Sequence, residues 1–102
     1  MTYNDILLLK DLLEKEGIPF EFDELFGGYI IAYPSMEDRV CSVIEHDYSC
    51  GSSSDLLEIR GLLTKEEELY DDVACLTALD AYDRIKFHWD KHKDIMKKVC
   101  NL

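Results

Sequence analysis

The stretch "PFEFDELFGGYIIAYPSMEDRVCSVIEH" at residues 19–46 contains the signals that decide the fold. Phenylalanines alternate with acidic residues from Phe20 to Asp23, as in a strand with one face buried. A glycine pair at positions 27 and 28 separates this segment from an aromatic and β-branched run, Tyr29 to Tyr33. Two strands joined around a glycine pair predict a β-hairpin.

The second half of the stretch predicts a turn and another strand. Residues 34–38 begin with Pro-Ser and are typical of a turn. The segment "RVCSVIEH" at residues 39–46 has apolar residues on both faces, which favours a strand in the centre of a sheet. After a glycine- and serine-rich loop at residues 49–55, the segment "LLEIRG" at residues 56–61 predicts a fourth strand.

The segment before this stretch predicts an amphipathic helix. In "YNDILLLKDLLEKE", residues 3–16, apolar residues recur every three or four positions between charged ones. We expect Thr2 or Asn4 to cap the start of this helix. Asp5 suits the positive end of the helix dipole, and the Gly-Ile-Pro sequence at residues 17–19 should end the helix.

Two further helical segments follow the predicted strands. "TKEEELYDD" at residues 64–72 predicts one or two turns of exposed helix, with Thr64 and Glu67 as a capping box. Thr77 and Asp80 form a weaker version of the same pattern at the start of a long final helix. An apolar stripe runs along one side of that helix, in steps of three and four residues: Ala78, Tyr82, Ile85, Trp89, His92, Met96 and Val99.

These elements predict a single α+β domain over residues 1–102. We expect an N-terminal helix, an antiparallel meander of three or four strands, a short acidic helical segment, and a long C-terminal helix packed on one sheet face. A chain of 102 residues has the usual size of one domain. Its apolar content of 47% is well above that of disordered chains.

The charge is strongly negative and unevenly distributed. The chain has 22 acidic and 11 basic residues, which gives a formal net charge of -11. Such a chain should bind neither nucleic acid nor anionic membranes directly, because contacts to phosphate require an excess of lysine and arginine. Residues 84–102 differ from the rest, since they contain 6 of the basic residues and 2 of the acidic ones. Lysines late in the final helix complement the negative end of its dipole.

The sequence predicts a cytoplasmic protein. It has neither an apolar run long enough to span a membrane nor a signal-peptide pattern. The four cysteines, Cys41, Cys50, Cys75 and Cys100, form no C-x-x-C pair, which disfavours a zinc knuckle or a redox motif. In a reducing compartment we expect most of them to be reduced, with Cys41 and Cys75 as small core residues.

One histidine pair could bind a metal ion. His88 and His92 lie one helical turn apart, and Cys100 or an acidic residue could complete the ligands. The pair lacks the glutamate of the H-E-x-x-H signature, and His92 belongs to the apolar stripe. Packing and surface roles are therefore the stronger interpretation, and we expect no metal and no cofactor.

A second group superficially resembles a nucleophile with its base. His46 and Asp47 lie close in sequence to Ser49 and Cys50. Adjacent residues of a strand point to opposite faces, and neither a G-x-S-x-G elbow nor a papain-like context is present. We expect no catalytic residue here and no enzymatic activity.

The acidic run is the candidate contact surface. Carboxylates spaced on a rigid scaffold can attract a basic partner, and an aromatic residue among them favours a protein interface. A solvated helix face remains the alternative. The candidate residues are Glu66, Glu67, Glu68, Tyr70, Asp71 and Asp72.

Parts of the chain resemble a group of small uncharacterised acidic proteins of Firmicutes prophages and mobile elements. The resemblance covers residues 27–88 and includes "GGYIIAYPS", "CSVIEHDYSCGSSS" and "DLLEIRGLLTKEEELYDDVACLTALDAYDRI". The group's histidine, Ser-Tyr-Gly-rich loop, L-L-E-I-x-G segment and L-T-A helix start correspond here to His46, Tyr48 to Ser53, Leu56 to Gly61, and Leu76 to Ile85. Cys50 departs from the loop pattern. The resemblance implies a phage-linked accessory protein but no activity or site.

We therefore expect a non-enzymatic interaction protein. Its acidic surface would engage a basic protein of a bacterium or phage, for example one that handles nucleic acid. The alternative is a structural or assembly protein, in which Leu7 and the apolar stripe of the final helix form a homodimer.

Overall fold

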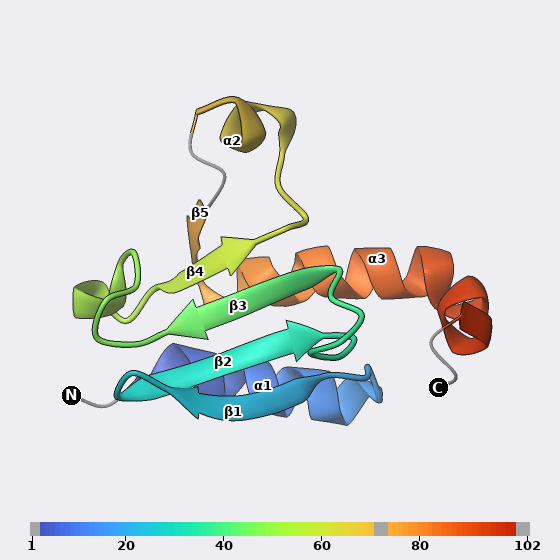
Figure 1. Ribbon diagram of the computed structural model, residues 1–102, viewed down its shortest axis with the longest axis horizontal. Coiled ribbons are helices and arrows are strands. Elements are labelled where there is room, and N and C mark those ends of the chain that lie inside the picture. Colours follow the sequence, from blue (N-terminus) through green and yellow to red (C-terminus); the bar gives the residue numbers. More distant parts are fainter. Residues whose placement is uncertain (1–2, 71–73, 100–102) are drawn as a thin grey trace.

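The computed structural model describes residues 3–70 and 74–99 and confirms the α+β class (Figure 1). Helices begin and end the described chain, and the strands lie between them. The elements are α1 (Asn4–Glu16), β1 (Glu21–Leu25), β2 (Gly28–Tyr33), β3 (Cys41–Glu45), a 3₁₀ turn (Ser52–Ser54), β4 (Leu57–Arg60), α2 (Lys65–Tyr70), β5 (Ala74–Leu76) and α3 (Ala78–Val99).

The sheet is an antiparallel meander with the strand order β1-β2-β3-β4-β5. The predicted central position of the third strand is confirmed, since β3 has two strands on either side. The fifth strand was not predicted. β5 has three residues, Ala74–Leu76, which is too short to show a period of two in the sequence.

A two-residue turn joins β1 to β2. Leu25 faces Gly28 in the register, so Phe26 and Gly27 form the turn, and both have positive φ (46° and 81°). Turns with this geometry match the twist of a hairpin. Gly28 is required for a different reason, because a Cβ there would collide with the main-chain oxygen of Glu45 on β3.

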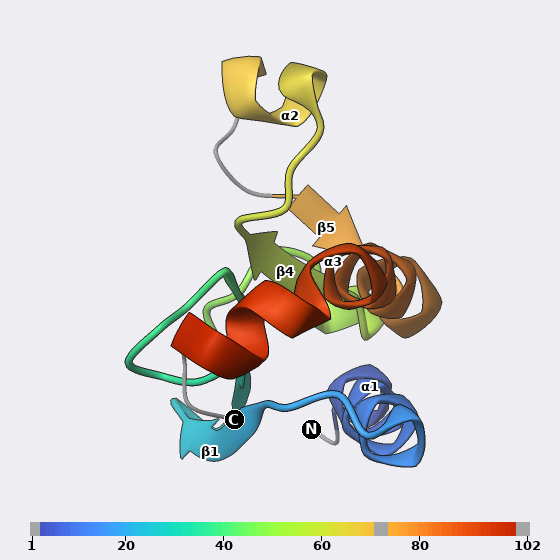
Figure 2. The ribbon, with the colours of Figure 1, turned by 90° about the vertical axis from the view of Figure 1, so that its right-hand side faces the viewer.

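Both long helices cover the same face of the sheet (Figures 1 and 2). The core lies between the helices and this face. In the register, Ile31 on β2 faces Val43 on β3, and Val43 faces Ile59 on β4, so one buried row crosses the sheet. Buried helix residues pack around this row: Ile6, Leu9, Leu13, Ala78, Ala81, Ile85, Trp89 and Met96.

The predicted stripe of the final helix is largely confirmed. Its residues Ala78, Ile85, Trp89 and Met96 are buried, while the other described side chains of the stripe are partly buried. The side chain of Val99 lies outside the described residues. Among the described residues, no helix is both long and apolar enough to cross a membrane.

The cap predicted for α1 is wrong. Tyr3 occupies the N-cap position, but its side chain makes no capping hydrogen bond and donates to Asp47 instead. Asn4 is already helical, and Thr2 lies outside the described residues. The carboxylate of Asp55, from the loop before β4, instead accepts hydrogen bonds from the main-chain N–H groups of Asn4 and Asp5, at 3.0 and 3.2 Å. A distant side chain therefore caps this helix.

The start of α3 combines a local cap with a distant one. The Thr77 hydroxyl accepts a hydrogen bond from the main-chain N–H of Asp80 at 3.3 Å, as predicted. Asp5 Oδ2 accepts a second bond, from the N–H of Ala78 at 2.6 Å. Asp5 was expected to favour the dipole of its own helix, but its carboxylate also ties the start of α1 to the start of α3.

The cysteine predictions are confirmed for Cys41 only. Cys41 is buried with a free thiol, and burial raises its pKa to about 12. Cys75 is exposed and forms a disulfide with Cys50, their Cα atoms being 6.0 Å apart. Cys75 faces Glu58 in the register, on the sheet face opposite to the helices, so it cannot be a core residue. Cys100 lies outside the described residues.

Candidate functional site

The predicted acidic segment stands away from the body of the protein. Figures 1 and 2 show α2 at the end of an arm, beyond β4 and the edge strand β5. We call Thr64 to Leu69 the acidic arm. Glu66 and Glu68 are exposed, and the side chain of Leu69 is 74% exposed. The side chain of Tyr70 and residues Asp71 and Asp72, which the prediction included, lie outside the described residues.

The predicted capping box at the base of the arm is confirmed. The main-chain N–H of Thr64 donates to Glu67 Oε1 at 2.8 Å. In return, the N–H of Glu67 donates to the Thr64 hydroxyl at 3.2 Å. These two bonds satisfy main-chain groups at the start of α2 that the short helix cannot pair itself.

Glu67 also anchors the arm to α3. Its carboxylate accepts two hydrogen bonds from the Arg84 guanidinium, at 2.7 and 3.0 Å. Arg84 donates a further bond to the main-chain oxygen of Leu62 at 3.1 Å. Arg84, followed by the N–H of Thr64, lowers the pKa of Glu67 to about 2. Glu67 is therefore occupied within the chain and cannot serve a partner without releasing the arm.

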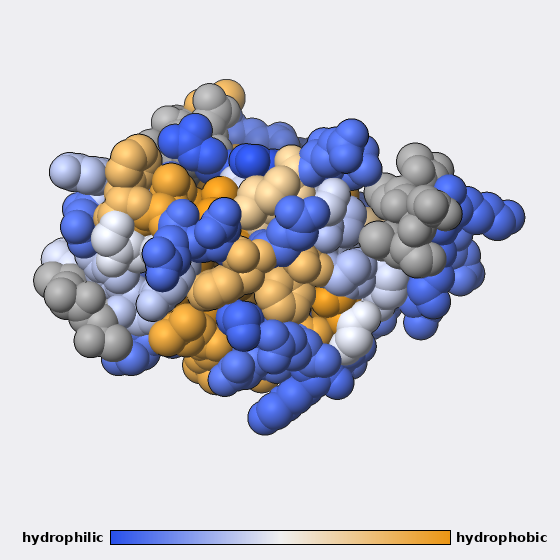
Figure 3. Space-filling view, turned by 60° about the horizontal axis from the view of Figure 1, so that its bottom comes forward, coloured by the Kyte–Doolittle hydropathy of each residue, from blue (hydrophilic) through white to orange (hydrophobic). Residues whose placement is uncertain are grey.

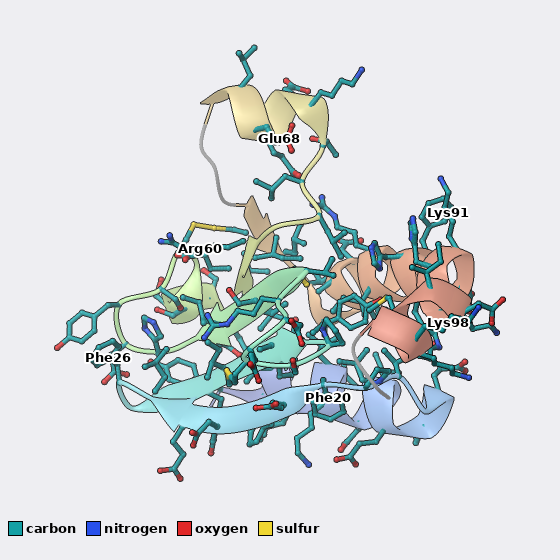
Figure 4. All side chains as sticks on the ribbon, turned by 45° about the vertical axis from the view of Figure 1, so that its right-hand side comes forward. Phe20, Phe26, Arg60, Glu68, Lys91 and Lys98 are labelled. Carbon is teal, nitrogen blue, oxygen red and sulfur yellow. A yellow bond between two sulfur atoms is a disulfide. The ribbon has the colours of Figure 1, made fainter. Side chains whose placement is uncertain are left out.

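Glu66 and Glu68 differ from Glu67 in this respect. Neither carboxylate has an ion pair with any residue that the structure describes. Figure 4 shows Glu68 on α2, far from the sheet. Of the described acidic residues in the predicted surface, two are thus free for a basic partner.

The histidine pair of α3 is stacked rather than splayed around an ion. The ring centroids of His88 and His92 are 4.3 Å apart. Burial, followed by the neighbouring His92, lowers the pKa of His88. Within residues 3–70 and 74–99, no group of three or more His, Cys, Asp or Glu side chains is placed to hold a metal ion.

The residues around His46 form a structural turn. The Ser49 hydroxyl donates to the main-chain oxygen of His46 and accepts from its N–H, both at 3.0 Å, so it does not contact the imidazole. The imidazole Nδ1 accepts a hydrogen bond from the N–H of Tyr48 at 3.0 Å. Because Cys50 is in the disulfide, none of these contacts forms a pair of nucleophile and base.

The structure brings together an aromatic cluster that the sequence analysis missed. Phe26, Tyr48 and His46 meet edge to face, with ring centroids 5.4 to 6.3 Å apart. His46 is buried, whereas the side chains of Phe26 and Tyr48 are 64% and 82% exposed. Figure 4 shows Phe26 at the tip of the hairpin. The sequence held one signal for this cluster, because Phe26 stands immediately before Gly27 at the predicted hairpin turn, where a bulky apolar side chain is exposed.

A buried carboxyl group lies at the end of β3. Glu45 on β3 is fully buried, and its Oε1 accepts a hydrogen bond from the N–H of Ile6 in α1 at 3.2 Å. Burial, followed by the nearby Asp55 carboxylate, raises the pKa of Glu45 to about 8. Glu45 Oε2 has no hydrogen-bond partner among the residues that the structure describes. Protonated, it can donate to Asp55, whose pKa is lowered by this interaction.

No family model matches the sequence, and neither a curated protein nor a solved structure matches the chain.

Proposed function

We propose that this chain is a non-enzymatic, acidic protein-interaction module whose partner is a basic protein, such as one that handles nucleic acid. The observation that carries the proposal is the acidic arm, which holds Glu66 and Glu68 away from the body without an ion pair to any described residue. Leu69 adds an exposed apolar side chain beside them. Carboxylates around a small apolar contact favour a partner with lysine and arginine around an apolar patch.

The aromatic cluster supports an interaction role at a second place. Exposed aromatic side chains supply much of the binding energy of protein interfaces, and Phe26 and Tyr48 are both largely exposed. Phe26 also holds a positive φ that a bulky residue seldom adopts. Acidic neighbours, Glu24 and Asp47, give this tip the same charge preference as the arm.

The proposal also includes the origin of the protein and its cellular compartment. The resemblance to prophage and mobile-element proteins suggests a phage-linked accessory protein of the cytoplasm that binds neither nucleic acid nor membranes directly. The Cys50–Cys75 disulfide argues against a reducing compartment. Fractionation of the host cells decides this part: recovery of the chain outside the cytoplasmic fraction would contradict the cytoplasmic location.

A pull-down from bacterial lysate tests the interaction. The arm variant combines Glu66→Lys and Glu68→Lys and leaves Glu67 in place, because Glu67 anchors the arm. The control variant carries the same charge change at Glu37 and Asp38, which are exposed in the β2–β3 loop. We expect wild type and control to recover the same partner and the arm variant to lose it. Equal recovery by all three proteins would refute the role of the arm.

The alternative, a helix-mediated homo-oligomer, stays a prediction. Most of the stripe on α3 that was expected to form the dimer packs inside one chain, and Leu7 also packs against the core. A dimer would have to use the exposed side chains of Leu79, Phe87 or Ile95. Light scattering at high micromolar concentration tests this alternative, since a monomer there would remove it.

A further inference from the structure

An open pocket lies where the connection from β4 to α2 passes over α3. Its volume is about 260 Å³. Leu62 and Leu63 line it from the connection. The remaining described lining residues come from α3 with helical spacing, so they share one side of that helix: Arg84, Phe87, His88, Lys91 and His92.

The polar part of the pocket is basic, in contrast to the chain as a whole. Four of the five α3 residues carry a guanidinium, an ammonium or an imidazole group, and no acidic residue is among the described lining residues. Glu67 already neutralises Arg84. Lys91 has no ion pair with any described residue, and its Nζ lies 5.9 Å from the centroid of the Phe87 ring. Lys91 is therefore a cation available to a ligand.

Each of the two imidazole rings is held in place through its Nδ1 atom by a group of the protein. His88 Nδ1 lies 2.8 Å from the Tyr33 hydroxyl, and His92 Nδ1 lies 3.1 Å from the main-chain oxygen of His88. Neither Nε2 atom has a hydrogen bond with a described residue. The single proton of the Tyr33 hydroxyl has two acceptors within reach, His88 Nδ1 and Met96 Sδ, the second at 3.4 Å. When it is donated to Nδ1, the proton of the neutral His88 ring lies on Nε2, where it can be donated to an anion. An imidazolium at His92 would offer a second donor.

The other walls are apolar. Leu62 and Leu63 are partly buried, and the side chain of Phe87 is 71% exposed. Leu62 has a positive φ of 53°, and Arg84 holds its carbonyl oxygen, so this part of the connection has a defined position over α3. The pocket is slightly smaller than those that bind drug-sized molecules, which fits a small ligand.

We propose that this pocket binds a small amphipathic anion, a carboxylate or phosphate joined to an apolar group. The anionic group lies at Lys91 and the imidazole edges, and the apolar group lies against Leu62, Leu63 and Phe87. Figure 4 shows Lys91 extending from α3 toward the side on which the arm lies. The cations of the pocket complement an anion, and its leucines and phenylalanine favour an apolar attachment over a free inorganic ion.

A nuclear magnetic resonance titration of the full chain tests the proposal. The probes are 4-phenylbutyrate, phenyl phosphate, and the neutral 4-phenylbutanol, each raised to about 10 mM. We expect at least one anion to shift the ring signals of His88 and His92 to saturation, and the alcohol to bind about tenfold more weakly or worse. Comparison of the two anions distinguishes a carboxylate from a phosphate ligand.

Two lysine variants localise the site. Lys91→Glu should weaken anion binding about tenfold or more, because it replaces the free cation with a like charge. Lys98→Glu makes the same change near the end of α3, outside the lining residues, and should leave the affinity within about twofold. The proposal is overturned if neither anion saturates the histidine signals, if the alcohol binds as well as the anions, or if both variants bind like wild type.

Discussion

Two acidic regions of this protein use the same side-chain type in opposite ways. At the start of α1, the carboxyl groups of Glu45, Asp55 and Asp5 receive main-chain N–H groups of two helices. In the acidic arm, Glu66 and Glu68 are exposed and have no ion pair with a described residue. The first region holds the helices to the sheet, and the second leaves its charge to the solvent.

The net charge of a chain therefore says little about where its charge can act on a partner. Each carboxylate that caps a helix is compensated by the partial positive charge of that helix end. Glu67 is a third case, because it belongs to the arm in sequence but pairs with Arg84. Only carboxylates that neither cap a helix nor pair with a cation of the same chain contribute to a contact surface.

The largest expected effect concerns Glu45 and pH. Its pKa of about 8 exceeds the ordinary value of 4.5, so the folded chain keeps a proton that the unfolded chain releases. The free energy of unfolding should therefore fall by up to about 1.4 kcal/mol for each pH unit between these two values. Glu45→Gln removes this titration while its amide can still accept from Ile6 and donate to Asp55. Urea unfolding at several pH values measures both slopes.

The same slope in wild type and in Glu45→Gln would contradict this account. As a control, Glu37→Gln changes an exposed loop carboxylate and should keep the wild-type slope. A variant that fails to fold at every pH would show that the carboxyl group itself, rather than its shape, is required.

The next largest effect concerns the cap that Asp55 provides. Asp55→Ala removes the acceptor for two N–H groups of α1 and places a Cβ-bearing residue without a polar side chain at a φ of 55°. We expect a loss of about 1 to 2 kcal/mol in the free energy of unfolding. Asp55→Asn keeps an acceptor and tolerates this φ, so it should recover most of the loss. Equal losses in thermal unfolding of the two variants would exclude capping as the cause.

A smaller and local effect is expected in the arm. Glu67→Ala removes the bidentate contact with Arg84 and half of the capping box. The cost should be about 1 kcal/mol and should be confined to α2. Amide hydrogen exchange measures it: exchange in residues 65–70 should accelerate, while exchange in β3 stays unchanged. Glu66→Ala is the matched control, and acceleration there to the same degree would contradict the anchoring role of Glu67.

The smallest effect belongs to the free carboxylates. Glu66→Gln combined with Glu68→Gln should change the free energy of unfolding by less than about 0.5 kcal/mol, since neither side chain has a described ion pair. Urea unfolding near neutral pH provides the measurement. A loss above about 1 kcal/mol would show that these carboxylates stabilise the fold, and would weaken the proposal that the arm serves a partner.

The sequence predicted features that local patterns control. The alternation around Phe22, the glycine pair after Phe26 and the stripe of α3 gave the hairpin and the final helix, because side-chain periodicity repeats within a few residues. The capping box of Thr64 and Glu67 was likewise predictable. Contacts between distant residues were not, so the cap by Asp55, the burial of Glu45 and the pairing of Cys50 with Cys75 were missed.

The candidate surface was predicted only in part, because local sequence patterns do not show which distant residues pair with it. A run of acidic residues identified the arm, but its neighbours in sequence could not reveal that Arg84, 17 residues beyond Glu67, pairs with one of them. The contact between Phe26 and Tyr48 joins two turns that are 22 residues apart in the sequence, so no local pattern predicts it. Residues Asp71 and Asp72 remain predictions outside the described part of the chain.

The edge position of β1 has a further consequence for behaviour in concentrated solution. Glu21, Asp23 and Glu24 are exposed along this strand. Figure 3 shows hydrophilic residues interspersed with hydrophobic ones on this side of the molecule. If the β1 strands of two copies paired edge to edge, their acidic side chains would lie close together. This repulsion opposes aggregation through unpaired strand edges.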